Sequence, residues 1–160
     1  MKNLISIFSI FLLLMNGSCK ENEQPQFATV DMMAFITILD EQGNNLLDPN
    51  QEGAYDPKDI KIFYERDGKM VEFYEGYLTM PRNFRIDPPE FGSDYLLALV
   101  LDSEKTIIKW NENESDTILA EFLNNEIQSL IVTKVYYQGQ LMHELPTTKR
   151  RGFTIVKQRQ

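Results

Sequence analysis

The sequence predicts an all-β protein, a single antiparallel β-sandwich, and three observations lead to that class. Apolar and polar residues alternate over short runs, as expected for strands with one buried face. Turn residues, among them Asp67-Gly68 and Gly139, separate these runs at short intervals. No stretch of helical length repeats its apolar residues with a period of 3.6. Short strands with frequent turns favour two packed antiparallel sheets.

The expected strands begin with residues 30–38, where apolar side chains recur at every second position. Residues 60–65 and 70–75 flank Asp67-Gly68, a strong signal for a two-residue hairpin turn. Residues 95–101 form a nearly continuous apolar run, which indicates a strand buried on both faces. The remaining expected strands are residues 106–110, 117–123 (alternatively a short helix over 117–125), 129–137, 140–145 and 153–157.

The Asp67-Gly68 turn also predicts which residues of this hairpin share a face. With two residues in the turn, Tyr64 lies opposite Val71, and Ile62 lies opposite Phe73. One face should therefore belong to the core, and it carries Ile60, Ile62, Tyr64, Val71 and Phe73.

The opposite face of the hairpin carries Phe63, Met70 and Tyr74 among charged residues. An apolar group in such a setting predicts an exposed patch that binds a partner. The alternative is that another loop or strand covers these three side chains.

The first 19 residues have the layout of an export signal. Lys2 provides a basic start, residues 4–15 are apolar except for two serines, and Cys19 follows small or polar residues. This run is too short to span a membrane, which needs about 20 apolar residues. The segment resembles a bacterial lipoprotein signal, which is cut before a lipidated cysteine. We therefore expect a signal peptide at 1–18, a lipidated flexible tether at 19–26 and the sandwich domain at 27–160.

Details of this region resemble lipoproteins of the Bacteroidetes. Asn16 stands where the usual pattern has Leu, a relaxation found in that phylum. Lys20, Glu21 and Glu23 resemble the acidic signal that directs such lipoproteins to the outer face of the outer membrane. Acylation of Cys19, with palmitate among the chains, would hold the protein in the cell envelope and display it on the surface. An ordinary signal peptide with an incidental cysteine is the alternative.

Composition limits the remaining choices. Removal of residues 1–18 leaves 142 residues, which suits one domain, and Cys19 is the only cysteine, so no disulfide is expected. The formal net charge of the whole chain is −8. An acidic domain of this kind is a poor partner for nucleic acid and for anionic lipid, so we expect membrane attachment through acyl chains alone.

Five short motifs are spread over the mature chain: residues 43–49 (GNNLLDP), 60–64 (IKIFY), 110–111 (WN), 116–118 (DTI) and 135–139 (VYYQG). Together they resemble a family of uncharacterised Bacteroidetes lipoproteins. The resemblance implies an immunoglobulin-like or transthyretin-like sandwich and carries no established activity or catalytic residue.

A long acidic loop is expected at residues 40–59. Calcium prefers six to eight oxygen ligands of the type found here, but the spacing matches no calcium-loop pattern. We interpret the loop as solvated, with Asp and Asn side chains forming local turns, and keep ligand binding as the alternative. Its acidic residues are Asp40, Glu41, Asp48, Glu52, Asp56 and Asp59.

The sequence does not favour catalysis, and we expect neither a metal nor a cofactor beyond the lipid on Cys19. His143 is the only histidine and is expected at the surface, so no Ser-His-Asp, Cys-His or metal-ligand set can be assembled. A glycosidase that uses two carboxylates is left open, because such a pair needs no fixed spacing.

Two binding functions follow as hypotheses. The first is a non-enzymatic interaction module that binds another envelope protein through the Phe63 face. The second is a glycan-binding accessory protein for nutrient capture, with loop tyrosines such as Tyr55 and Tyr77 at the site, whereas Trp110 is expected in the core. Thr117, in a short Asp-Thr-Ile pattern, is a candidate acceptor for O-glycosylation.

The lipoprotein hypothesis predicts that Cys19→Ala abolishes stable membrane attachment, because the acyl chains have no other acceptor. Fractionation of cells should find the variant in the soluble pool, while Ser18→Ala remains in the membrane. Equal retention of Cys19→Ala and the unaltered protein would contradict the hypothesis.

Overall fold

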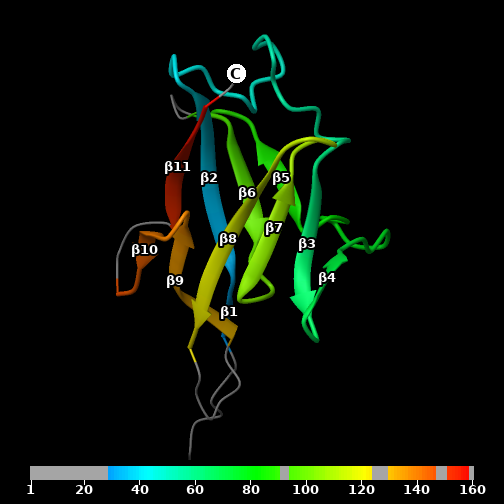
Figure 1. Cartoon of the computed structure of the whole chain (residues 1–160), viewed down its shortest axis with the longest axis vertical. Helices are drawn as coiled ribbons and strands as arrows, with labels where there is room; N and C mark the ends of the chain where they lie inside the picture. The colour runs from blue at the N-terminus through cyan, green and yellow to red at the C-terminus, as the bar shows by residue number, and fades with distance from the viewer. Residues whose placement is uncertain (1–28, 91–93, 124–129, 147–150, 159–160) are drawn as a thin grey trace, which may run out of the picture.

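The fold is all-β. The computed structural model describes residues 29–90, 94–123, 130–146 and 151–158, and these ranges contain eleven strands and no helix (Figure 1). The strands are β1 (Val30–Asp31), β2 (Met33–Asp40), β3 (Lys61–Arg66), β4 (Lys69–Glu72), β5 (Phe84–Asp87), β6 (Leu96–Val100), β7 (Lys105–Lys109), β8 (Ser115–Phe122), β9 (Leu130–Tyr137), β10 (Gln140–Glu144) and β11 (Gly152–Lys157).

The strands form two layers, which confirms a sandwich-like architecture (Figure 1). The larger sheet has the order β1-β9-β8-β7-β3-β4, with β10 also paired to β9, and the smaller sheet has the order β11-β2-β6-β5. Most neighbours are antiparallel, but β1 pairs with β9 and β11 pairs with β2 in parallel. The expectation of purely antiparallel sheets is therefore wrong at these two edges.

The core fills the space between the two layers. On β2, Ala34, Ile36 and Ile38 are buried at alternating positions, as the sequence predicted. The larger sheet contributes Ile108 and Trp110, both fully buried, which confirms the core position of the tryptophan. Each sheet therefore presents one apolar face, and burial of these two faces against each other holds the layers together.

The first expected strand is divided between the two sheets. It breaks at Met32, so that β1 belongs to the larger sheet and β2 to the smaller one. Val30, expected on the apolar face, is 64% exposed because β1 lies at the edge of its sheet. This strand crosses from one layer to the other and closes one side of the sandwich.

Both expected two-residue turns are present. Asp67 and Gly68 have φ values of 51° and 73°, and Gln138 and Gly139 have 49° and 77°, as in the type I′ turns that match strand twist. Ile60, Ile62 and Tyr64 are buried, as predicted, and Phe73 packs partly against the core. Val71 is 49% exposed, so its placement in the core was wrong: β4 is a short edge strand and Val71 lies near its open end.

In three further details, the structure either differs from the sequence-based expectation or decides between two alternatives. Strand β5, between Pro81 and Pro88, was not predicted. The alternative of a short helix near residue 117 is wrong, because β8 covers that region. A regular two-residue turn at Gln138-Gly139 would place His143 opposite Lys134, but a register shift in β10 places it opposite Val135.

The predicted signal peptide at residues 1–18 and the predicted lipidation site Cys19 lie outside the described residues, as do Lys20, Glu21 and Glu23. Within the described ranges, no helix is long and apolar enough to cross a membrane.

Neighbouring isoleucines on β7 test the assignment of its two faces. Ile108 is fully buried between the sheets and Ile107 is half-buried on the outer face. Ile108→Ala should lower the free energy of unfolding by about 2–5 kcal/mol, because it leaves a cavity in the core. Ile107→Ala should cost clearly less, measured by chemical denaturation of both variants. Equal losses would mean that the faces are assigned incorrectly.

Candidate functional site

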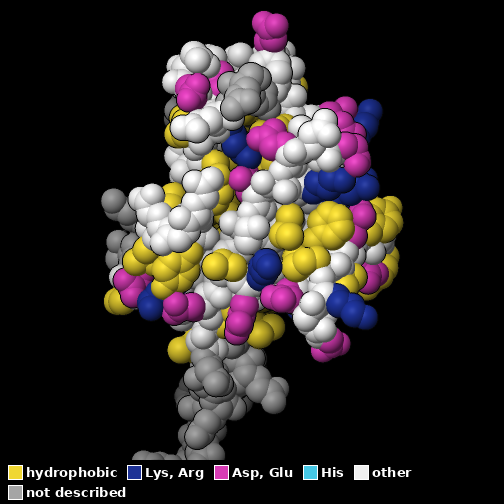
Figure 2. Space-filling model, in the orientation of Figure 1, with side chains coloured by type: hydrophobic (Ala, Val, Ile, Leu, Met, Phe, Trp, Pro, Cys, Tyr) yellow, Lys and Arg dark blue, Asp and Glu magenta, His cyan; other side chains and the backbone are white. Residues whose placement is uncertain are grey.

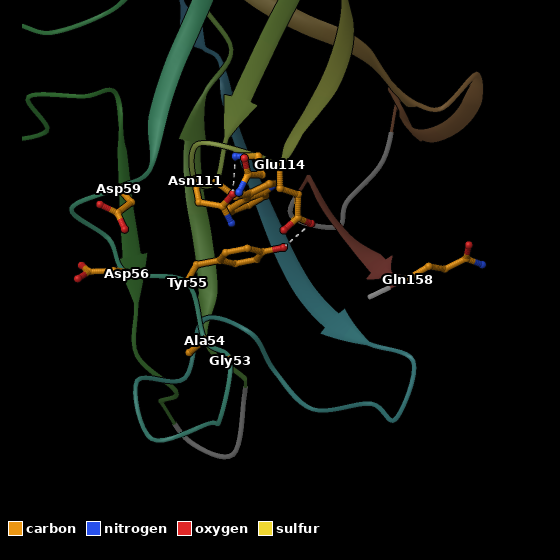
Figure 3. A pocket seen from close by; sticks show the side chains of 10 residues that line it. Gly53, Ala54, Tyr55, Asp56, Asp59, Asn111, Glu114 and Gln158 are labelled. Carbon is orange, nitrogen blue, oxygen red and sulfur yellow. Dashed lines mark hydrogen bonds between the residues drawn. The ribbon is translucent and has the colours of Figure 1, made fainter. Parts of the chain in front are cut away.

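The loop after β2 and the turn between β7 and β8 meet at one end of the sandwich (Figure 1), and a large hollow lies between them (Figure 3). It has a volume of about 820 Å³ and is open to solvent. Figure 3 shows Tyr55 extending across it toward Glu114, with Asp56 and Asp59 on one side and Gln158 on the other. Its lining is Gly53, Ala54, Tyr55, Asp56, Asp59, Trp110, Asn111, Asn113, Glu114 and Gln158. We call this hollow the end pocket.

The floor of the end pocket is a pair of stacked aromatic rings. The ring centroids of Tyr55 and Trp110 lie 4.7 Å apart with an angle of 20° between their planes. Tyr55 is only 6% exposed and Trp110 is fully buried. Because each ring covers the other, the pair makes a rigid floor and offers little free ring surface to a ligand.

A chain of charged side chains lies directly behind this floor. Lys157, only 6% exposed, places its ammonium nitrogen 3.0 Å from Oε1 of Glu114 and in direct contact with Oδ2 of Asp116. The Tyr55 hydroxyl donates to the same Glu114 oxygen at 2.7 Å. We call Lys157, Glu114 and Asp116 the charge network. It joins the two sheets, because Lys157 belongs to β11 and Asp116 to β8.

Two further donors hold the buried Asp116 carboxylate. The indole nitrogen of Trp110 donates to Oδ2 at 2.6 Å, and the Tyr137 hydroxyl donates to Oδ1 at 2.9 Å. Burial and the adjacent Asp116 charge raise the pKa of Tyr137, so its hydroxyl keeps the proton that it donates. The ammonium of Lys157 also lies 5.2 Å from the centroid of the Trp110 ring. Each oxygen of Asp116 therefore has a partner, as a buried charge requires.

Local geometry explains why these residues meet. Trp110 donates its backbone N–H to the carbonyl of Glu114 at 2.9 Å, which closes a tight turn between β7 and β8. Glu114 and Asp116 are two residues apart, the spacing that puts side chains on one face of an extended chain. On β8, Asp116 lies on the same buried face as Ile118. On β11, Lys157 lies on the same buried face as Ile155.

The loop at residues 40–59 is anchored more firmly than a solvated loop would be. Leu46 and Leu47 are buried in the core beside Tyr55. Its acidic side chains do form local turns, as predicted: Asp40 accepts hydrogen bonds from the backbone N–H groups of Gln42 and Asn44. Hydrogen bonds from Asn44 lower the pKa of Asp40. Among the described residues, no group of three or more His, Cys, Asp or Glu is arranged to hold a metal ion.

The three residues of the predicted partner patch line two separate hollows. Phe63 and Met70 are half-buried and line a hollow of about 260 Å³ together with Ile107. Figure 2 shows hydrophobic side chains surrounded by charged ones over β3 and β7. Tyr74 is 63% exposed and lines another hollow beside Pro81. Thr117 is exposed on β8, where it pairs with Ile107 of β7.

A second buried cation lies before β11. Arg151 donates to the carbonyl oxygens of Met33 (2.7 Å) and Val132 (2.8 Å) and forms an ion pair with Asp31 at 3.1 Å. His143, expected at the surface, is half-buried, and its Nε2 is buried without a hydrogen-bond partner. Burial lowers the pKa of His143, and the nearby positive charge of Arg151 lowers it further.

The hydroxyl of Tyr55 provides a test of the pocket floor. Tyr55→Phe keeps the ring stack and removes the hydrogen bond to Glu114, and should lower the free energy of unfolding by about 1.5 kcal/mol. Tyr136→Phe is the matched control, because its hydroxyl donates to Glu121 at 2.8 Å on the exposed outer face. Thermal or chemical denaturation should show a smaller effect for the control. The reverse order would contradict this description of the floor.

Comparison with known proteins adds no relative to these observations. No protein-family model matches the sequence, and no significant match is found among the curated proteins or among the solved structures. The similarity to a Bacteroidetes lipoprotein family therefore stays a prediction that rests on the motifs of the sequence.

Proposed function

We propose that this protein is a lipid-anchored, exported, non-enzymatic binding module of the cell envelope, displayed on the outer membrane surface. Its sandwich is of the immunoglobulin-like or transthyretin-like type, and its ligand site is the end pocket. The observation that carries the proposal is the lining of that pocket. Six residues with hydrogen-bonding side chains line an open hollow of about 820 Å³ that has a stacked aromatic floor, namely Asp56, Asp59, Asn111, Asn113, Glu114 and Gln158.

The lining favours a neutral ligand rich in hydroxyl groups, which makes a glycan the best candidate. Carboxylate and amide oxygens accept hydrogen bonds from hydroxyl groups, and amide nitrogens donate to them. Asp56, Asp59 and Glu114 repel an anionic ligand, as does the net charge of −8. Because the faces of Tyr55 and Trp110 are stacked on each other, recognition here depends on hydrogen bonds more than on ring stacking.

The engagement of Glu114 favours binding over hydrolysis. A glycosidase needs one carboxyl group that is free to donate a proton and a second that acts on the sugar or on water. Glu114 instead holds an ion pair with Lys157 and accepts the hydroxyl of Tyr55. Toward a ligand in the pocket, the role of Glu114 is to fix the floor and present its remaining acceptor capacity, and any proton transfer by Glu114 is directed to its buried neighbour Lys157.

The second candidate function is docking of an envelope protein through the outer face of the larger sheet. It is favoured by the half-buried pair Phe63 and Met70, which lies with Ile107 in a shallow apolar hollow. The ion pair between Lys109 and Glu112, at 2.8 Å, borders the same hollow. Apolar groups with a charged rim are typical of protein interfaces. The end pocket is favoured over this surface because its volume and polar lining suit a defined small ligand.

The proposal predicts that the detergent-solubilised full-length protein binds neutral oligosaccharides on a glycan array. In titration calorimetry with a bound glycan, Asp59→Asn and Asn113→Ala should each weaken affinity by roughly tenfold, through the loss of one hydrogen-bonding partner. Glu144→Gln, on β10 and away from the pocket, should bind like the unaltered protein.

Two results would overturn the pocket as the ligand site: no binding of any neutral glycan, or an equal loss for Glu144→Gln. Cross-linking in intact cells then decides the second candidate. One dominant protein partner, lost in Phe63→Ser, would support docking through the outer face.

A further inference from the structure

We propose that Lys157 and Asp116 form an intramolecular isopeptide bond, a covalent amide link between the two sheets, with Glu114 as the proton-transferring residue. The proposal concerns a modification of the chain itself and does not depend on the ligand of the end pocket.

The reacting groups already touch. The Lys157 nitrogen is in direct contact with Oδ2 of Asp116. Because Oδ2 is bonded to the carboxyl carbon, the amine lies beside the carbon that it would attack. Both side chains are more than 90% buried, Lys157 at 6% and Asp116 at 8% exposure. The folded chain therefore holds the amine and the carboxyl group at a high effective concentration. For well-oriented groups, this effective concentration reaches roughly 10⁵–10⁸ M.

The surroundings supply the other requirements of amide formation. Glu114 lies 3.0 Å from the lysine nitrogen, within reach of a proton transfer. Trp110 and Tyr137 donate hydrogen bonds to the two oxygens of Asp116, at 2.6 and 2.9 Å. Donors in these positions stabilise the negative charge that forms on oxygen when the amine adds to the carboxyl carbon. The end pocket, which Glu114 lines, gives the released water a route to solvent.

The reaction balances without a co-reactant. One proton passes from the Lys157 ammonium to the Asp116 carboxylate, which leaves a neutral amine and a carboxylic acid. The nitrogen adds to the carboxyl carbon, Glu114 takes a second proton from nitrogen and delivers it to the hydroxyl that leaves, and the carbon–oxygen bond breaks. The products are one amide and one water. No electron is gained or lost, and Glu114 ends as a carboxylate.

The test is peptide mapping of the purified full-length protein after denaturation and digestion with trypsin. A bond would appear as one species that contains residues 110–134 and 152–159, lighter than their sum by the mass of one water. The second peptide extends past Lys157 because trypsin does not cut after an acylated lysine. An ion pair would separate on denaturation and yield the two peptides singly.

Variants assign the roles of the residues. Lys157→Arg keeps the positive charge and should abolish the linked species. Glu114→Gln keeps both reacting groups and should slow formation by roughly 10²-fold, the contribution typical of a positioned proton acceptor. The exposed ion pair between Lys134 and Glu121, at 3.1 Å, is an internal control that should stay unlinked in the same digest.

Recovery of residues 110–134 and 152–157 only as separate peptides from the unaltered protein would overturn the proposal and leave a plain ion pair. Undiminished linkage in Lys157→Arg would overturn the assignment of the lysine. Neither result depends on whether Asp116→Ala, which removes a buried partner, still folds.

Discussion

The arrangement of the two sheets depends on positive charges that are buried between them. Lys157 pairs with Asp116 and Glu114 at one end of β11, and Arg151 pairs with Asp31 just before its other end. Lys157 and Asp116 are both buried, and removing one partner of such a pair costs about 3–5 kcal/mol. Asp31 is 53% exposed, so its ion pair with Arg151 contributes less. Any displacement of one sheet along the other would separate these partners. The apolar core supplies the general attraction between the layers. The links from Lys157 and Arg151 to carboxyl groups of the larger sheet, whether ionic or covalent, specify their register.

Local sequence patterns predicted most of the strands, because alternation and type I′ turns depend on neighbouring residues. The Asp67-Gly68 hairpin formed with the expected register between Tyr64 and Val71. The parallel edges formed by β1 and β11 could not be predicted in the same way. Their partners, β9 and β2, are far away in the chain, and no local turn connects them. Strand β5 was missed because its alternation of apolar and charged residues covers only four positions, between Pro81 and Pro88.

The candidate site was harder to predict, because it combines a loop, a turn and the last strand. Asp116 and Lys157 are 41 residues apart, and only the fold brings them together. The sequence did contain one usable signal. Asp116 occupies the same alternating phase as Ile118 and Ala120, and Lys157 occupies that of Ile155. A charged residue in the inward phase of a strand indicates a buried charge with a partner elsewhere. The stack of Tyr55 on Trp110 had no comparable signal. Tyr55 lies in a loop, where no alternating pattern indicates whether a side chain points into the core or toward solvent.

The course of β2 gives the molecule two functionally distinct ends. β1, the first described strand, lies at one end of the sandwich, and β2 runs from there for eight residues to the loop that carries Tyr55 (Figure 1). At about 3.3 Å per residue, this strand alone separates the two ends by roughly 25 Å. The chain enters the domain at the end remote from the hollow. In the proposed lipid-anchored protein, the attachment would therefore lie at the end of the domain opposite the opening, so that the opening stays accessible to large polymers in the medium.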